Sequence, residues 1–258
     1  MRLRYVVAIS MLLLGSISCT AQINNAAKVG AAVENIRLED GSKVAFIRIV
    51  NNSDKDITAF NLSIDVTFKN GKASHFEHMT DFLPGIISGG REALHPGNSY
   101  EVRIDIQAGT ELLSASAKLD VVAYADLSAD VDKNQDALVR LVGARKSDAL
   151  AQERSAEIIN AAAADTVSPD PVGLAIRQLR QVAEQIKGRS TELSETKLGS
   201  IIADLENRSA QAAFERERTG MEVWEQHTTE VAFLRGYASR RNKDAITVEA
   251  HSHLKRTN

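Results

Sequence analysis

His75, Glu77, His78 and Asp81 lie close together in the sequence and are residue types that bind metal ions. Imidazole and carboxylate groups are the usual ligands of catalytic zinc, whose bound water can attack an ester or amide. A metal-dependent hydrolase that uses His75, His78 and Asp81 is therefore one hypothesis. These residues, however, follow an alternating segment, and in a strand that continues this far His75 and His78 point to opposite faces. We expect solvated side chains at a strand end here in preference to a metal site.

A second group of oxygen-bearing side chains has the spacing of a calcium-binding loop: Asp130, Asp132, Asn134 and Asp136. Such a loop also needs a glycine at its sharp turn and a bidentate glutamate at its end, but Gln135 and Leu141 occupy these positions. Carboxylates also suit the first turn of a helix, because the positive end of the helix dipole lies there. We therefore expect an acidic helix start rather than a calcium site, and we predict no cofactor.

The motifs of several enzyme classes are missing from the chain. It has no G-x-S-x-G of serine hydrolases, no GxxxxGK[ST] phosphate loop and no GxGxxG dinucleotide motif. Cys19 is the single cysteine, which excludes an intrachain disulfide framework, a CxxC redox motif and zinc sites built on several cysteines. We therefore predict no catalytic residues and a protein that is not an enzyme.

Alternation of apolar and polar residues predicts strands in the first half of the chain. The clearest case is the apolar series Phe60, Leu62, Ile64, Val66 and Phe68, which alternates with polar residues. Segments 43–50, 100–106 and 119–124 are further strand candidates, and the turn pairs Asp40-Gly41 and Asn70-Gly71 separate strands. About seven short strands at this spacing predict an antiparallel immunoglobulin-like β-sandwich over residues 22–128.

Helical spacing replaces the alternation after about residue 126. Leu138, Leu141, Val142 and Arg145 are spaced three and four apart, which is typical of one helix face. We expect helices over 133–164, 172–187 and 192–241, with a break near Gly220. The heptads are irregular, so a helical hairpin or small bundle over 129–241 is favoured over a coiled coil. A mobile tail, 242–258, should follow, and the fold class is α+β.

One apolar stripe of the helical half is the candidate partner-binding surface: Met221, Trp224, Val231 and Leu234. Methionine and aromatic side chains are common in protein interfaces, so a stripe that stays partly exposed could bind a partner or a second copy of the chain. Packing within the chain is the alternative that would bury it. The partner itself is unknown from the sequence.

Four short motifs resemble an Ig-like β-sandwich domain found in uncharacterised secreted bacterial proteins. They are NNSDKDITAF at 51–60, Asn70-Gly71, HPGNSY at 95–100 and VVAYAD at 121–126. The resemblance covers roughly residues 30 to 160 and implies a sandwich followed by an α-helical segment. The family pattern carries Asp-Gly after the last strand, whereas Leu127 follows Asp126 in this chain. The resemblance implies no activity.

The first 21 residues have the three-part order of a secretory signal peptide. Arg2 and Arg4 precede an apolar run over 5–14, and small residues follow it. The run is shorter than the roughly 20 residues that a spanning helix needs, and no later apolar segment approaches that length. We therefore predict an exported protein, periplasmic or secreted, without a transmembrane segment in its mature chain.

Two processing routes are open at the end of this signal. Cleavage after Ala21 would start the mature chain at Gln22 and remove Cys19. Alternatively, Ser16-Ile17-Ser18-Cys19 resembles a bacterial lipobox, in which Cys19 would become a lipid-modified N-terminus, although Ser16 stands where that pattern prefers leucine. The second route would make the protein a lipid-anchored structural component of the envelope.

The charge balance argues against nucleic-acid binding. The chain has 31 basic and 34 acidic residues, and its net charge is −3. The clustered basic residues Arg240, Arg241 and Lys243 are expected to be solvated, so no basic face is available to displace phosphate counterions. The sequence thus favours an exported, non-enzymatic envelope protein in which a β-sandwich platform carries a helical interaction segment.

Overall fold

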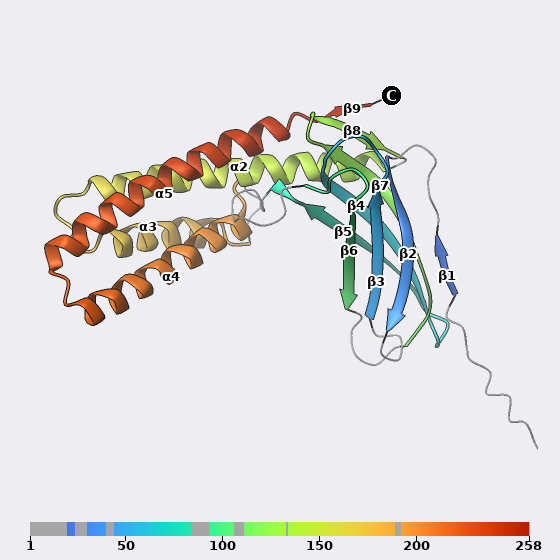
Figure 1. Cartoon of the computed structure of the whole chain (residues 1–258), viewed down its shortest axis with the longest axis horizontal. Helices are drawn as coiled ribbons and strands as arrows, with labels where there is room; N and C mark the ends of the chain where they lie inside the picture. The colour runs from blue at the N-terminus through green and yellow to red at the C-terminus, as the bar shows by residue number, and fades with distance from the viewer. Residues whose placement is uncertain are drawn as a thin grey trace, which may run out of the picture.

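Strands in two sheets precede the helices α2 to α5 in the computed structural model, which describes residues 20–23, 30–39, 44–83, 93–105, 111–132, 134–188 and 192–257 (Figure 1). The fold is therefore α+β, as predicted. No helix in these ranges combines the length and the apolar character needed to cross a membrane. Cys19 and the rest of segment 1–19 lie outside the described residues, whereas the predicted cleavage point after Ala21 lies within strand β1.

The strands fall into two hydrogen-bonded groups. The larger sheet has the order β5-β4-β7-β8-β9, with β1 paired to β7, and the smaller sheet has the order β2-β3-β6. Their bounds are β1 Thr20–Ile23, β2 Ala31–Glu39, β3 Val44–Asn51, β4 Ile57–Phe68, β5 Ala73–Asp81, β6 Ser99–Asp105, β7 Leu112–Tyr124, β8 Ser128–Val131 and β9 Lys255–Arg256. Most neighbours are antiparallel, but β1 lies parallel to β7 and β9 parallel to β8.

One apolar core joins the two sheets. Ile47 and Ile49 of β3 contribute to it from the smaller sheet, and the alternating residues of β4 contribute from the larger one. The predicted core positions Phe60, Leu62, Ile64 and Val66 are all buried. This confirms the strand register inferred from alternation, since every second side chain of β4 points into the shared core.

The helices α2, α3 and α4 each start where the sequence supplies a capping side chain, whereas Glu222 before α5 makes no side-chain capping hydrogen bond. Asn134 caps α2 (Gln135–Ala164), and Asp170 caps α3 (Pro171–Ile186), which has proline in its first turn. Ser194 caps α4 (Glu195–Thr219). Gly220 then ends α4 in the left-handed conformation, with φ at 66°, before α5 (Val223–His251) begins. The predicted break near Gly220 is confirmed.

The helices form a bundle that projects from one end of the sheets (Figure 1). α5 packs chiefly along α2, and α4 packs chiefly on α3. A core of alanine, isoleucine and leucine side chains, with Tyr237, fills the bundle. Near the start of α2, Ala137 and Leu141 pack against the larger sheet, where they contact Ala59, Val121 and Ala123.

Two predicted boundaries of the helical half are wrong. β8 extends the larger sheet to Val131, so the helices begin at Gln135 and not at 129. The expected tail, 242–258, instead continues α5 to His251 and then adds β9 to the sheet edge. Ala245 and Val248 of this segment are buried where α5 packs along α2, whereas Ile246 between them is exposed.

Candidate functional site

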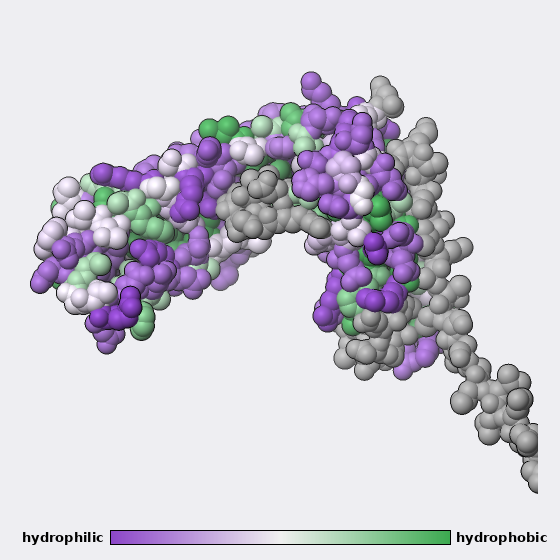
Figure 2. All heavy atoms as spheres, viewed as in Figure 1, coloured by the Kyte–Doolittle hydropathy of each residue, from purple (hydrophilic) through white to green (hydrophobic). Residues whose placement is uncertain are grey.

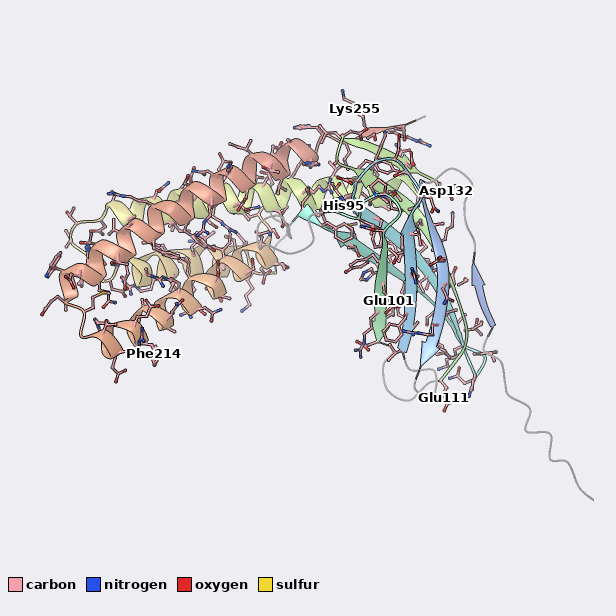
Figure 3. The ribbon with its side chains drawn as sticks, in the orientation of Figure 1. His95, Glu101, Glu111, Asp132, Phe214 and Lys255 are labelled. Atoms are coloured by element: carbon pink, nitrogen blue, oxygen red, sulfur yellow. The ribbon has the colours of Figure 1, made fainter. Side chains whose placement is uncertain are left out.

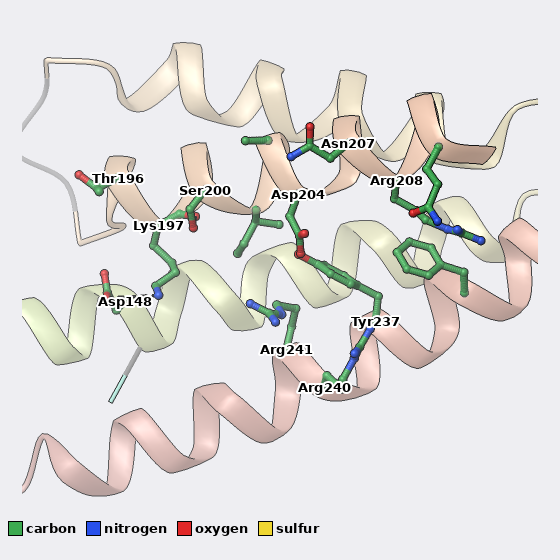
Figure 4. Close-up of a pocket in the computed structure, with 14 residues that line it drawn as sticks. Asp148, Thr196, Lys197, Ser200, Asp204, Asn207, Arg208, Tyr237, Arg240 and Arg241 are labelled. Carbon is green, nitrogen blue, oxygen red and sulfur yellow. Dashed lines mark hydrogen bonds and ion pairs between the residues drawn. The ribbon is translucent and has the colours of Figure 1, made fainter. Parts of the chain in front are cut away.

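A groove separates α4 from α5, although these helices are consecutive in the chain. It has a volume of about 1130 Å³ and is lined by residues of both helices, with Asp148 of α2 at one end (Figure 4). The groove exists because each helix packs on a different neighbour, α4 on α3 and α5 on α2. Its walls are polar along much of their length, which is unusual for the inside of a helical bundle.

Four cationic side chains line the groove: Lys197 and Arg208 from α4, and Arg240 and Arg241 from α5. Lys197 Nζ lies 3.8 Å from Asp148 Oδ2, and Arg241 Nη2 lies 3.4 Å from Asp244 Oδ2. Arg208 Nη1 lies 3.8 Å from Glu215 Oε2. Within the described residues, none of these four cations donates a hydrogen bond to a carboxylate, and their ion pairs are long.

Tyr237 joins the two walls of the groove. Its hydroxyl donates to Asp204 Oδ2 at 2.7 Å, so that one hydrogen bond crosses from α5 to α4 (Figure 4). Burial, with the hydrogen bond to Asp204, raises the pKa of Tyr237. The Arg241 guanidinium lies over the same ring, 4.8 Å from its centroid, and Arg208 lies over the Phe233 ring at 5.0 Å.

Two guanidinium nitrogens at the groove have no protein partner. Arg241 is only 8% exposed, and its Nε is buried without a hydrogen bond; the same holds for Nε of Arg208. Because buried polar atoms are nearly always hydrogen-bonded in native proteins, this group points to a site that takes a polar ligand.

The structure does not bring His75, His78 and Asp81 together as metal ligands. β5 pairs with β4 in a continuous register, so His75 and His78 point to opposite faces, as predicted. His75 Nδ1 lies 2.8 Å from Asp65 Oδ1, and Asp81 accepts from Arg145. Within the described residues, no group of three His, Cys, Asp or Glu side chains could hold a metal ion. The structure therefore does not assemble a metal site from these residues, because alternation along the strand separates them.

The acidic series before α2 is also dispersed over separate partners. Asp130 Oδ2 accepts from the Gly30 amide at 3.0 Å and from the Tyr124 hydroxyl at 2.7 Å. Burial opposes ionisation of Asp130, but hydrogen bonds from Thr257, Tyr124 and Gly30 outweigh it and lower its pKa. Asp132 forms an ion pair with Lys118.

The remaining two residues of the series belong to the start of α2. Asn134 accepts from the Ala137 amide at 3.2 Å, and Asp136 lies in the first helical turn. The helix start is therefore the observed role of this end of the series, and the calcium spacing does not produce a shared site because β8 holds Asp130 in the sheet.

The candidate stripe, which runs from Met221 just before α5 to Leu234 within it, is exposed at one end and buried at the other. Leu234 is fully buried and Val231 packs against the same core, whereas Trp224 is 67% exposed and Met221 is partly exposed. Leu234 as a partner-binding residue is therefore wrong, since the stripe turns inward as α5 runs along α2. Trp224 and Met221 lie at the far end of the bundle, next to the α4–α5 turn.

Sequence reasoning missed the groove because it assigned Arg240 and Arg241 to solvent. Arg241 is instead buried, and Tyr237 precedes it by one helical turn on the same face. The spacing of Tyr237 and Arg241, combined with Lys197, Asp204 and Arg208 on the preceding helix, was the available signal. Its meaning depends on α4 and α5 facing each other, which the sequence does not specify.

Comparison with known proteins gives little guidance. No family model matches the chain, and no curated protein matches it. A 1.85 Å X-ray structure of a hypothetical protein from Peptoclostridium difficile 630 is 10% identical, and the match covers 43% of this chain and 91% of that one. The TM-score of this match is 0.29, so the similarity carries no argument about fold or function.

Proposed function

We propose that the chain is an exported, non-enzymatic protein of the bacterial envelope. The two-sheet region is an immunoglobulin-like sandwich that serves as a platform, and the helices present a surface that binds a protein partner. The observation that carries this proposal is an apolar surface at the far end of the bundle. We call it the tip surface and define it by Phe214, Met221, Val223 and Trp224.

The tip surface lies where α4 ends and α5 begins, at the end of the bundle that is distant from the sheets (Figures 1 and 3). Phe214, Val223 and Trp224 are 65%, 64% and 67% exposed. Hydrophilic residues cover much of the remaining face in view (Figure 2). Large apolar side chains gathered at one exposed position are typical of protein interaction sites, and aromatic side chains and methionine are enriched in them.

Export is supported by the order of charge, apolar run and small residues in segment 1–21. We propose cleavage after Ala21, with lipidation of Cys19 as the alternative route. The intact mass of the protein purified from its native envelope separates the two routes. A mass that starts at Gln22 supports cleavage, a mass that starts at a lipidated Cys19 supports the anchor, and a cytosolic protein that retains Met1 contradicts export.

Site-specific photocrosslinking tests the tip surface. A photoreactive residue at position 224 should give discrete crosslinked species in the native envelope, because the side chain there is directed at the partner. The matched control is position 139, since Val139 is also apolar and 64% exposed but lies on α2 near the sheets. Equal crosslinking from both positions, or none from 224, would contradict the proposal.

The oligomeric state shows whether the partner is a second copy. Sedimentation of the purified protein should show a monomer if the partner is another envelope protein. A dimer that Trp224→Ser converts to a monomer would identify the tip surface as a self-association site. A dimer that persists in Trp224→Ser would show that another surface joins the copies, and the tip proposal would then rest on the crosslinking result alone.

A further inference from the structure

The groove between α4 and α5 contains a buried cation whose hydrogen-bonding capacity is not met by the protein. Arg241 is 8% exposed, its Nε has no partner, and its only ion pair in the described chain is the 3.4 Å approach to Asp244. A buried guanidinium with an unmade hydrogen bond destabilises the fold. Binding of an oxyanion in the groove would supply the missing acceptor, and this would explain why the chain keeps an unsatisfied arginine at the groove wall.

The charge of the groove agrees with an anionic ligand. Lys197 of α4 and Arg241 of α5 face the same end of the groove (Figure 4). Arg240 follows Tyr237 by three residues on α5 and also lines the groove. The carboxylates that face these cations are Asp148 of α2, Asp204 of α4 and Asp244 of α5.

These carboxylates do not satisfy the cations. Asp204 is engaged by the Tyr237 hydroxyl, and Asp148 lies 3.8 Å from Lys197, beyond hydrogen-bond distance. Asp244 Oδ2 lies 3.4 Å from Arg241 Nη2, an ion pair without a hydrogen bond. The cationic end of the groove therefore has donors in excess of acceptors.

Aromatic rings extend from the cationic end toward the tip. Tyr237 lies next to Arg241, and Phe233 lies one turn further along α5, with their ring centroids 5.6 Å apart. Tyr237 is buried in the bundle core, whereas Phe233 is partly exposed, so an apolar portion of a ligand could lie against Phe233 while its charged group contacts Lys197 and Arg241. The groove volume of about 1130 Å³ is sufficient for an organic molecule and exceeds what a free inorganic ion needs.

We propose that this groove binds a small organic anion, in which a carboxylate or phosphate group pairs with Arg241 and Lys197 and an apolar group lies against Phe233. Arg241 is the anchor because it is a buried cation of the groove wall whose Nε has no acceptor among the described residues. Lys197 adds a second charge from the opposite wall. The groove shares no residue with the tip surface, so the anion-binding proposal is tested independently of the proposed protein partner.

Binding of matched probes tests both halves of the proposal. The probes are 4-phenylbutyrate and phenyl phosphate, with 4-phenylbutanol as the neutral control of the same carbon skeleton. Calorimetry of the full chain should show binding of at least one acid and no binding of the alcohol. The NMR signal of the Arg241 Nε–H should shift on addition of that acid, because the ligand supplies its missing acceptor.

Variants locate the site and control for folding. Lys197→Gln and Arg241→Gln should each weaken binding of the acid about tenfold or more, since a hydrogen bond to a charged group is lost. Lys243→Gln removes an exposed charge from the same helix and should leave binding unchanged. If Arg241→Gln fails to fold, Lys197→Gln carries the test. Equal binding of acid and alcohol, equal loss in Lys243→Gln, or no binding of either acid would overturn the proposal.

Discussion

Arg145 of α2 and Asp81 of β5 form a two-point ion pair that joins the helical bundle to the larger sheet. Arg145 Nε donates to Asp81 Oδ2 at 2.9 Å, and its Nη2 donates to Asp81 Oδ1 at 3.2 Å. The same guanidinium donates to Thr58 Oγ1 at 3.2 Å and to the His251 carbonyl at 3.0 Å. Arg145 is 1% exposed. One buried side chain thus connects α2 to β4, β5 and the last residue of α5.

Replacement of this arginine should strongly destabilise the protein. Arg145→Met keeps much of the side-chain volume but removes the donor to Thr58 and to the His251 carbonyl and the ion-pair partner of Asp81, which keeps only its described hydrogen bond from the Leu83 amide, so we expect a loss of about 3–5 kcal/mol in the free energy of unfolding. Chemical denaturation measures it. The control is Arg154→Met, which removes an exposed ion pair with Glu157 on the same helix and should cost no more than about 0.5 kcal/mol. Similar costs for both variants would contradict the structural role of Arg145.

The divided stripe on α5 predicts opposite effects for two of its residues. Leu234→Ala should lower the free energy of unfolding by about 2–5 kcal/mol, because it opens a cavity in the bundle core. Trp224→Ala should change it by less than about 0.5 kcal/mol, since most of this side chain is already in water. Thermal or urea unfolding of the two variants compares them directly. A large cost for Trp224→Ala would show that the tip surface is packed.

His251 should make stability depend on pH. Burial, together with the positive charge of Arg145, lowers its pKa from the ordinary value of 6.5, while Asp81 acts in the opposite direction. Below about pH 6.5 the unfolded chain binds a proton at this residue that the folded chain does not bind, so the free energy of unfolding falls as the pH is lowered. Above that pH the contribution is fully present. Burial lowers the pKa of His78 as well, which acts in the same direction.

Substitution of His251 tests this dependence. His251→Gln should reduce the loss of stability between about pH 7 and pH 5, measured by urea unfolding at several pH values. The change in slope is the diagnostic quantity, because any constant cost of the substitution cancels. An unchanged slope would be evidence against a role for His251 in the pH dependence.

Two glycines should respond oppositely to alanine. A Cβ at Gly143 meets nothing within 4 Å, and this position lies inside α2, so Gly143→Ala should stabilise the protein by about 0.5–1 kcal/mol. A Cβ at Gly30 would lie 2.3 Å from the Tyr124 hydroxyl oxygen and 2.9 Å from Ser53 Cβ. Gly30→Ala should therefore cost about 1–3 kcal/mol. Melting temperatures of the pair give the comparison, and a shift in the same direction for both would refute it.

The elements of the fold were largely accessible from local patterns. Phe60, Leu62, Ile64 and Val66 alternate with polar residues, and this period is set by the strand itself. Asn134, Asp170 and Ser194 could be recognised near helix starts, and Gly220 near a helix end, because capping acts between residues close in the chain. The end of α5 was misplaced because polar residues after Arg241 hide Ala245 and Val248, which are buried against α2.

The candidate sites depended on contacts between distant segments. His75, His78 and Asp81 are close in sequence, but Asp81 is bound by Arg145, 64 positions later, and alternation separates the two histidines. Arg145 was correctly placed on the helix face with Leu138 and Leu141, yet nothing local indicated its acidic partner. Leu234 and Trp224 share a stripe in sequence but not a burial state.

The sequence by itself determined the order of strands and helices, the buried face of β4 and the absence of several catalytic motifs, because these depend on periodicity and residue type within short segments. Only the tertiary structure decided that α4 and α5 face each other across a groove, that Arg241 is buried there and that Arg145 joins the bundle to the sheet. The reason is physical: a charge is stabilised or left unsatisfied by groups that approach through space, and their approach is set by how the helices pack, not by their spacing along the chain.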